Sequence, residues 1–220
     1  ESEIEQFVPE KYWIIGALVR KLVVPLSPFR IKLVKIDGRK AEVKSVEETD
    51  RVRADLEGRQ IRVDKVQVRE VRKRPPPPYI TSTLQQAGSS ACGFTPKRTM
   101  GIAQKLYEGV DLGQGATGLI TYMRTDSVSV SADAIGACRD FINRKYGEAF
   151  CPEKPNYYRS RSGAQEAHEA IRPTDVNRTP ESLSKKLDAA ELKIYRLIWQ
   201  RFVASQMRPA VLLQRTVVME

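Results

Sequence analysis

The chain has 220 residues, and its 37 Lys and Arg against 27 Asp and Glu give a formal net charge of +10 and a pI of about 9.6. This length suffices for one large domain or two small ones. The sequence contains no apolar run long enough to span a membrane and no signal peptide. The positive charge favours a polyanion as partner, with a basic but indifferent surface as the alternative.

The three cysteines, Cys92, Cys138 and Cys151, lie far apart and form no CxxC pair. This spacing argues against a zinc site and fits a reducing compartment. The chain starts at Glu1 rather than Met and stops inside a run of strand formers, Val211–Met219, so we expect it to be part of a longer protein.

The first third of the chain is predicted to be mostly β. Tyr12–Val19 is rich in strand-forming residues. Asp37 and Gly38 lie between Ile31–Ile36 and Lys40–Val46, and an Asp-Gly pair is typical of a type I′ turn because both central residues need positive φ. These segments therefore predict a hairpin.

A short helix and a long strand are predicted next. Glu47–Glu57 has helical spacing and ends at Gly58, while Ile61–Val71 alternates apolar and polar residues like a half-buried strand. Pro75–Pro78 can continue neither element and predicts a stiff, extended connector. Before the prolines stands a basic cluster that either touches DNA or is a solvated strand end, namely Arg69, Arg72, Lys73 and Arg74.

Beyond the prolines the pattern becomes helical. Ser82–Ala91 is one predicted helix. Thr95 and Pro96 predict the start of another, as N-cap and first helical residue, and Gly109 ends it. Its apolar stripe is predicted to be Met100, Ala103, Leu106 and Tyr107.

Two more helices are predicted after a glycine-containing loop, 111–118, and a strand-like run, 118–123. Ser131 is the expected cap of the first helix, whose buried face would be Ile135, Cys138, Phe141 and Ile142. Asp188 and Glu191 form a capping-box pattern for the second helix, which closes before Pro209. Its face of large apolar residues is predicted to be core: Leu192, Tyr195, Trp199 and Phe202.

Strand formers return from Ala210, so the order along the chain is β, helical, β. We therefore predict an α+β fold, in which a mainly helical domain over residues 75–209 is inserted into a β-rich domain made of residues 1–74 and 210–220.

Two segments carry candidate chemistry, and the first contains Tyr122 and Arg124. In an extended chain, residues two apart point to the same face. A phenol that attacks a phosphodiester needs its developing charge stabilised, which the paired donors of a guanidinium can do. A Tyr-x-Arg pair on a strand is also common for structural reasons, so the pair alone is a weak signal.

The second segment, 163–174, holds the only histidine of the chain. If it is helical up to Pro173, then Gln165, His168 and Arg172 share one polar face, and protonated His168 can donate to a phosphate oxygen. The alternative is a solvated helix end with a Glu169–Arg172 ion pair. The segment lacks the second histidine of a zincin HExxH motif.

Motifs of other enzyme classes are absent. The sequence has no GxxxxGK[ST] phosphate loop, no GxSxG nucleophile elbow and no DxD pair for magnesium. Any metal that assists a tyrosine nucleophile would therefore lie on another part of the protein.

These residues resemble the bacterial topoisomerase I branch of the type IA DNA topoisomerase family. GLITYMRTDS, Gly118–Ser127, is similar to the family's active-site signature, and QEAHEAIRPT, Gln165–Thr174, is similar to its second signature. We name them the first and second signature segments. The flanking runs are similar in the same order, namely FVPEKYW, PPPPYITSTLQQ, FTPKRTMGIAQKLYEG and LIWQRFVASQM.

The resemblance implies that Tyr122 is the nucleophile and forms a 5′-phosphotyrosyl bond without ATP. It implies that Arg124 stabilises charge at the scissile phosphate and that His168 and Arg172 assist phosphate binding. Gln165 and Asp126 are expected to contact DNA or phosphate as well. Met123 stands where topoisomerase III-like members usually carry proline, which favours the topoisomerase I branch, with reverse gyrase as a related possibility.

The resemblance also implies a β-rich arch domain and a helical, CAP-like nucleophile domain that the arch lifts to open a gate. The TOPRIM domain, which binds Mg²⁺ in this family, is absent from the sequence, so we expect no metal site and little cleavage by this chain alone. Expected partners are single-stranded and negatively supercoiled DNA and the remaining domains of the same polypeptide, in the cytoplasm. The alternatives are a non-catalytic, basic DNA-binding and gating module, and a tyrosine recombinase or type IB-like enzyme with a 3′ linkage.

Overall fold

The computed structural model describes residues 2–23, 27–113, 115–159 and 168–220. The chain divides into two compact units, Glu1–Gln67 with Thr216–Glu220, and Val68–Arg215. Both divisions fall within long strands, whereas the sequence pattern changes from β to helical at residue 74 and back at residue 210.

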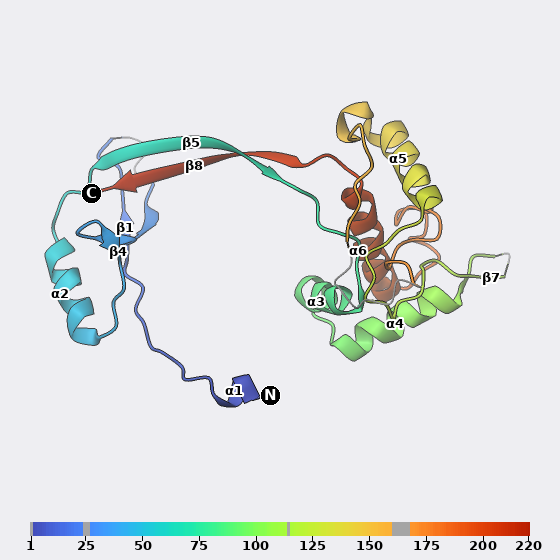
Figure 1. Cartoon of the computed structure of the whole chain (residues 1–220), viewed down its shortest axis with the longest axis horizontal. Helices are drawn as coiled ribbons and strands as arrows, with labels where there is room; N and C mark the ends of the chain where they lie inside the picture. Colours follow the sequence, from blue (N-terminus) through green and yellow to red (C-terminus); the bar gives the residue numbers. More distant parts are fainter. Residues whose placement is uncertain (1, 24–26, 114, 160–167) are drawn as a thin grey trace. The chain divides into compact units, whose positions relative to one another are not determined.

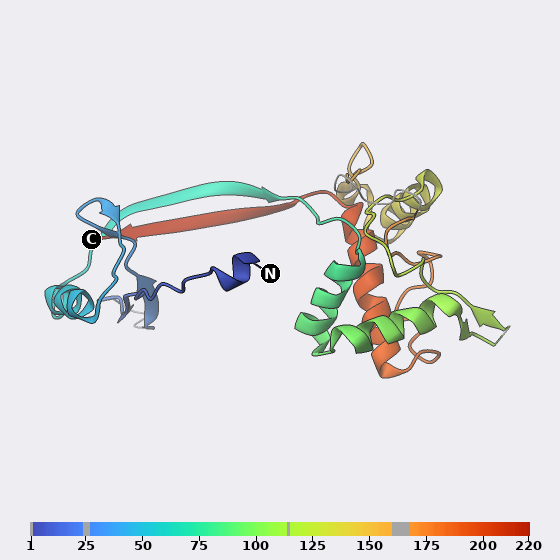
Figure 2. The ribbon, with the colours of Figure 1, turned by 60° about the horizontal axis from the view of Figure 1, so that its bottom comes forward.

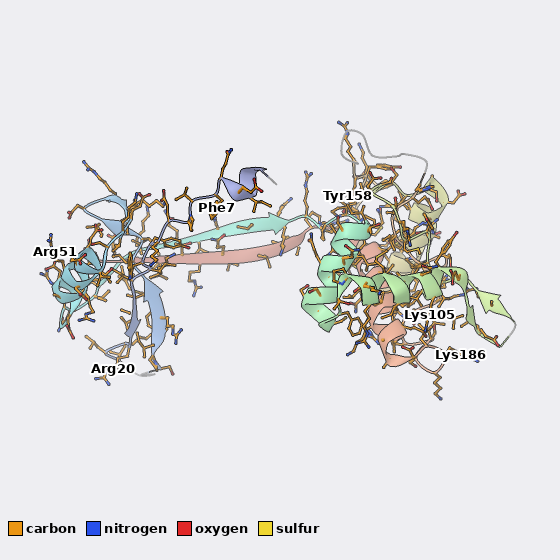
Figure 3. The ribbon with its side chains drawn as sticks, turned by 90° about the horizontal axis from the view of Figure 1, so that it is seen from below. Phe7, Arg20, Arg51, Lys105, Tyr158 and Lys186 are labelled. Atoms are coloured by element: carbon orange, nitrogen blue, oxygen red, sulfur yellow. The ribbon has the colours of Figure 1, made fainter. Side chains whose placement is uncertain are left out.

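The described part of the first unit holds two small antiparallel sheets and two helices. β1 (Gly16–Val19) pairs with β2 (Phe29–Lys32), and β3 (Lys35–Ile36) pairs with β4 (Arg39–Lys40). The short helix α1 (Ser2–Glu5) precedes them. Arg20 and Arg51, labelled in Figure 3, are exposed on this unit.

The predicted turn is confirmed, but the predicted hairpin is too long. Asp37 and Gly38 have φ values of 48° and 78°, as a type I′ turn requires. Only two residues on each side pair across this turn, and Ile31 lies opposite Ala17 instead. Residues 29–32 pair with β1, and the chain turns back on itself only after them. The local sequence pattern does not indicate this pairing with a more distant strand.

Helix α2 (Val46–Leu56) agrees with the predicted helix. The Ser45 hydroxyl accepts a hydrogen bond from the Glu48 N–H at 3.1 Å, and Gly58 follows the helix with a φ of 77°. Both ends of the helix are thus determined by local chemistry.

Strands β5 (Val63–Lys73) and β8 (Ala210–Met219) form a two-stranded sheet and run in opposite directions (Figure 1). The expectation of a half-buried strand is wrong, since every residue of β5 is exposed except the partly covered Val71. Among the described residues no other strand joins this sheet, so the alternation of β5 has no core to face.

The second unit is a helical body whose main helices were predicted from the sequence. α3 (Thr81–Cys92), α4 (Pro96–Glu108) and α6 (Ala189–Ser205) pack on one another (Figure 2). α5 (Ala132–Tyr146) is followed by the short 3-10 helix η1 (Glu148–Phe150). The core holds Leu84, Leu106, Ile142, Ile198 and Phe202, among others.

The predicted caps are confirmed. The hydroxyls of Thr95 and Ser131 accept the N–H groups of Arg98 and Ala134, at 3.2 and 3.4 Å. At the start of α6, the Asp188 carboxylate accepts the Glu191 N–H at 2.8 Å, and the Glu191 carboxylate accepts the Asp188 N–H at 3.0 Å. The predicted buried faces of α5 and α6 are buried or partly buried.

Two expectations for α4 and the loop after it are wrong. Tyr107 was expected in the apolar stripe of α4 but is 41% exposed, because Ile102, Ala103 and Leu106 already fill that face. The loop expected after α4 contains a small antiparallel pair, β6 (Val110–Asp111) with β7 (Ala116–Thr117).

The proline connector is held against the helical body. The hydroxyl of Tyr158, labelled in Figure 3, lies 3.0 Å from the carbonyl oxygen of Pro75 and 2.9 Å from that of Ser205. Pro78 and Tyr79 are buried, and the Arg201 guanidinium stacks 4.2 Å from the ring centre of Tyr79. The connector therefore enters α3 along a defined path.

Candidate active site

The first signature segment alternates in exposure from Tyr122 to Ser127. Tyr122, Arg124 and Asp126 are exposed, while Met123, Thr125 and Ser127 are buried. The expected strand over 118–123 is wrong in its extent, because only Ile120 makes a β-bridge, to Pro173. The alternation itself leaves the tyrosine and the arginine accessible together.

The second signature segment is not helical over its described part. His168–Arg172 contains no helix, and Ile171 makes a β-bridge to Tyr79, with its N–H donating to the Tyr79 carbonyl at 2.8 Å. These backbone groups find partners across the fold rather than within a helix, so the predicted shared helical face is wrong. Gln165 lies outside the described residues.

Hydrogen bonds of Thr121 join the two signature segments. Its N–H donates to the Arg172 carbonyl at 2.9 Å, and its hydroxyl donates to the Ala170 carbonyl at 2.6 Å. The same hydroxyl accepts the Arg172 N–H at 3.0 Å. A threonine directly before Tyr122 thus sets the register between the segments.

Three aromatic rings meet at the predicted nucleophile. The ring centres of Tyr107 and Tyr122 lie 5.3 Å apart with the planes at 65°, and those of Tyr122 and His168 lie 5.5 Å apart at 79°. Tyr122 is 38% exposed, and Tyr107 and His168 are also exposed. The fold brings together residues from α4 and both signature segments.

The side chains of Arg124 and Asp126 are exposed and make no hydrogen bond or ion pair to another described residue. A guanidinium without a protein partner keeps all its donors available for an anion. In this respect Arg124 is suited to contact a phosphate beside Tyr122.

Arg172 is engaged within the protein. Its guanidinium pairs with the Glu169 carboxylate and donates to the Pro173 carbonyl at 3.0 Å, and its side chain is only 13% exposed. Its Nε is buried without a hydrogen-bond partner among the described residues. The ion pair between Glu169 and Arg172 is the one named as the alternative in the sequence analysis. Phosphate binding by Arg172 stays a prediction.

Glu169 also ties the second segment to the start of α5. Its carboxylate accepts the Ser131 N–H at 2.6 Å. Burial alone would raise the pKa of Glu169, but the Ser131 N–H and the Arg172 guanidinium together hold this pKa below its ordinary value. The carboxylate is therefore charged in the folded protein at neutral pH.

Within the described ranges, no group of three His, Cys, Asp or Glu side chains is placed to hold a metal ion. Burial raises the pKa of the Cys138 thiol to about 12, which makes it a poor nucleophile and ligand. None of the described helices is both long and apolar enough to cross a membrane.

Three residues beside the site were missed by reasoning from the sequence. Tyr107 was assigned to the core of α4, and the threonines Thr81 and Thr121 were given no role. Only their positions in the sequence could have pointed to them: Thr121 directly precedes the predicted nucleophile, and Tyr107 lies near the end of a predicted helix. Neither position shows which partners a side chain meets.

The chain is similar to known proteins over nearly its whole length. A family model described as DNA topoisomerase matches residues 1–220. DNA topoisomerase 1 of Xylella fastidiosa (strain Temecula1 / ATCC 700964) is 48% identical over 221 aligned residues, which cover 96% of this chain and 27% of that protein. DNA topoisomerase 1 of Campylobacter jejuni is 45% identical, covering 96% of this chain and 30% of that protein.

A solved structure is similar as well. The full-length topoisomerase I from Thermotoga maritima matches with a TM-score of 0.71 and 34% identity, covering 99% of this chain and 33% of that one. The chain thus spans about a third of the solved relative and 27–30% of these two curated relatives.

Proposed function

Since this chain belongs to the bacterial DNA topoisomerase I family, we propose that it is the nucleophile-bearing part of a type IA DNA topoisomerase. One observation carries the proposal: the exposed Tyr122 lies ring to ring with His168, although 46 positions separate them (168 − 122). Arg124, whose side chain has no partner among the described residues, follows Tyr122 two residues later. In this arrangement the phenol lies beside an imidazole able to bind phosphate, and an exposed guanidinium is close to it along the chain.

In the proposed reaction the Tyr122 phenol oxygen attacks a phosphorus of one DNA strand. A bond forms between that oxygen and the phosphorus, the bond from phosphorus to the 3′ oxygen breaks, and the phenol proton is lost while the departing 3′ oxygen gains a proton. The product is a 5′-phosphotyrosine and a free 3′-hydroxyl. Attack by that hydroxyl reverses each step, so no ATP is consumed.

Arg124 and His168 would stabilise the negative charge that develops on the phosphate. The transition state gathers negative charge on the phosphate oxygens, which the paired N–H donors of Arg124 can stabilise. A protonated His168 would add one more donor beside the Tyr122 ring. Asp126 and Gln165 stay candidates for DNA contact, with Asp126 exposed next to Arg124.

Metal binding would be the task of another domain of the same polypeptide. The family implies Mg²⁺, but the described residues do not fit a metal site. We propose that a TOPRIM domain elsewhere in the same polypeptide holds the metal. The residues 1–74 and 210–220 would form the arch, and the residues 75–209 the CAP-like nucleophile domain.

In the whole protein these parts would cleave one strand, pass another through the break and religate. The substrates proposed are single-stranded and negatively supercoiled DNA in the cytoplasm, and the product is relaxed DNA. The net charge of +10 supports the affinity for DNA.

A complementation assay tests the proposal. The chain is mixed with a separately produced TOPRIM-containing portion, magnesium and end-labelled single-stranded DNA, and covalent adducts are separated. We expect an adduct on the 5′ side of the break that disappears in Tyr122→Phe while DNA binding is retained. Cleavage that persists in Tyr122→Phe refutes the nucleophile, and an adduct on the 3′ side points to a type IB-like mechanism.

A second candidate is a non-catalytic, basic DNA-binding and gating module. The observation that favours it is the positive charge combined with the lack of a metal site among the described residues. Salt-sensitive DNA binding with no adduct, in the assay and in the full-length protein, supports this candidate over the first.

A further inference from the structure

The first residue of α3 holds the backbone on both sides of Arg124. The Thr81 hydroxyl donates to the Met123 carbonyl at 2.8 Å and accepts the Thr125 N–H at 2.9 Å. The Thr81 N–H donates to the Thr125 carbonyl, also at 2.9 Å. One residue thus bonds the peptide groups that precede and follow the arginine.

The hydrogen bonds that join residues 123–125 to a described helix come from Thr81, while the buried side chain of Met123 adds apolar packing in the core. Residues 121–131 belong to no strand, so no sheet ladder fixes the position of Arg124. The Arg124 side chain forms no hydrogen bond or ion pair with a described residue. Thr125 does help to shape the next turn, because its hydroxyl accepts the Ser127 N–H at 3.0 Å. Thr81 therefore provides hydrogen bonds that fix the backbone on both sides of Arg124 to the start of α3.

The position of Thr81 is itself well defined. Tyr79, two residues earlier, is bridged to Ile171 of the second signature segment and covered by Arg201. The Ile80 N–H donates to the Thr83 hydroxyl at 3.0 Å, which closes the first turn of α3. Tyr79 and Thr81 thus contact one signature segment each, and the start of α3 relates the two.

We propose that Thr81 is a positioning residue of the active site, which determines where the Arg124 guanidinium meets the scissile phosphate. The inference rests on the proposed function of Tyr122 and Arg124. Loss of its hydroxyl leaves the Thr125 N–H and the Met123 carbonyl without this partner, so the arginine is presented over a wider range of positions. Small displacements of groups that stabilise a transition state are costly to rate.

The test compares Thr81→Val, which keeps the shape and loses the hydroxyl, with Thr81→Ser, which keeps the hydroxyl. Both are made in the full-length protein with magnesium, and the rate of adduct formation is measured at saturating DNA. We expect a loss of about tenfold or more in Thr81→Val, near wild-type rates in Thr81→Ser, and unchanged DNA affinity.

Two controls distinguish a positioning role of Thr81 from a general contribution to the stability of α3. Thr83→Val removes a hydroxyl that bonds Ile80 in the same helical turn without touching residues 123–125, so its rate should stay near wild type. Combined with Arg124→Ala, Thr81→Val should cost nothing further, because two residues that act through one group are not additive. Additive losses, or equal losses in Thr83→Val, overturn the proposal.

Amide exchange at Thr125 reports the bond itself without DNA. Exchange should be faster in Thr81→Val than in the wild type and unchanged in Thr83→Val. Unchanged exchange, or faster exchange with a wild-type rate of adduct formation, refutes the positioning role. If the wild type makes no adduct, the proposed function fails and this role with it, while the exchange result still describes the bond.

Discussion

Tyr107 and Tyr122 lie edge to face with their ring centres 5.3 Å apart, which places the end of α4 against the predicted nucleophile. The contact is held from the backbone, since the Leu119 N–H donates to the Leu106 carbonyl at 2.7 Å. A tyrosine whose ring contacts both Tyr107 and His168 presents its phenol over a narrower range of directions than a ring without neighbours. The orientation of the attacking oxygen therefore depends in part on Tyr107, which takes no part in the proposed reaction.

Replacement of Tyr107 tests that dependence. Tyr107→Ala removes one of the two rings, and edge-to-face pairs contribute about 0.5–1.5 kcal/mol beyond their buried area. If that energy orients Tyr122, the single-turnover rate of adduct formation falls about threefold to tenfold. Tyr107→Phe keeps the ring and should behave like the wild type. Equal damage in both variants would instead assign the role to the Tyr107 hydroxyl.

Arg124 should matter for cleavage and little for folding. Its side chain is exposed and has no described partner, so Arg124→Ala should leave the melting temperature nearly unchanged. Loss of a donor that stabilises the transition state costs about a hundredfold in rate. Arg124→Lys, which keeps the charge without the paired donors, should recover only part of that loss. A collapsed melting temperature in Arg124→Ala would show a structural role instead.

Local chemistry made much of this fold predictable. The N-caps at Thr95, Ser131 and Asp188 depend on one side chain and the N–H groups two or three residues later, and all three were read correctly. The Asp37-Gly38 turn depends on two φ angles and was equally clear. Such features are settled within a few residues, so a sequence is enough to find them.

The errors concern residues whose partners are far away in the chain. His168–Arg172 has helical spacing, yet Ile171 bonds to Tyr79 and Arg172 bonds to Thr121. Tyr107 fits the apolar stripe of α4 but lies beside Tyr122 instead. The signature segments could be located from the sequence, while the contacts that assemble them could not, because spacing along a chain does not contain the packing of one element on another.

Glu169 gives the joined segments a dependence on pH. Its pKa is lower in the folded than in the unfolded protein, so its contribution to stability is present above the ordinary glutamate pKa of about 4.3 and is lost as the pH falls through the folded value. We expect the melting temperature of the chain to fall on acidification below about pH 4.5, and less steeply in Glu169→Gln.

The matched control is Glu153→Gln, since the Glu153 side chain is exposed and its carboxylate has no described partner. This variant should follow the wild-type acid transition. Equal slopes in the wild type and Glu169→Gln would mean that other carboxylates dominate the transition.

At Gly118 the first signature segment passes close to the backbone of α4. A Cβ atom there would lie 2.8 Å from the Tyr107 carbonyl oxygen, a backbone atom that cannot move without shifting the helix end. Gly118→Ala should therefore separate the segment from α4, weaken the bond between Leu119 and Leu106, and cost about 1–3 kcal/mol of the free energy of unfolding.

Gly101 offers the opposite result within the same helix. It lies in the interior of α4, and nothing stands within 4 Å of where its Cβ would be. Gly101→Ala should stabilise the chain by about 0.5–1 kcal/mol, because alanine loses less conformational freedom on folding. Urea unfolding of the two variants measures both effects. If Gly118→Ala were as stable as Gly101→Ala, the close approach that places Tyr107 beside Tyr122 would not constrain the site, and the ring contact would have to arise from the side chains alone.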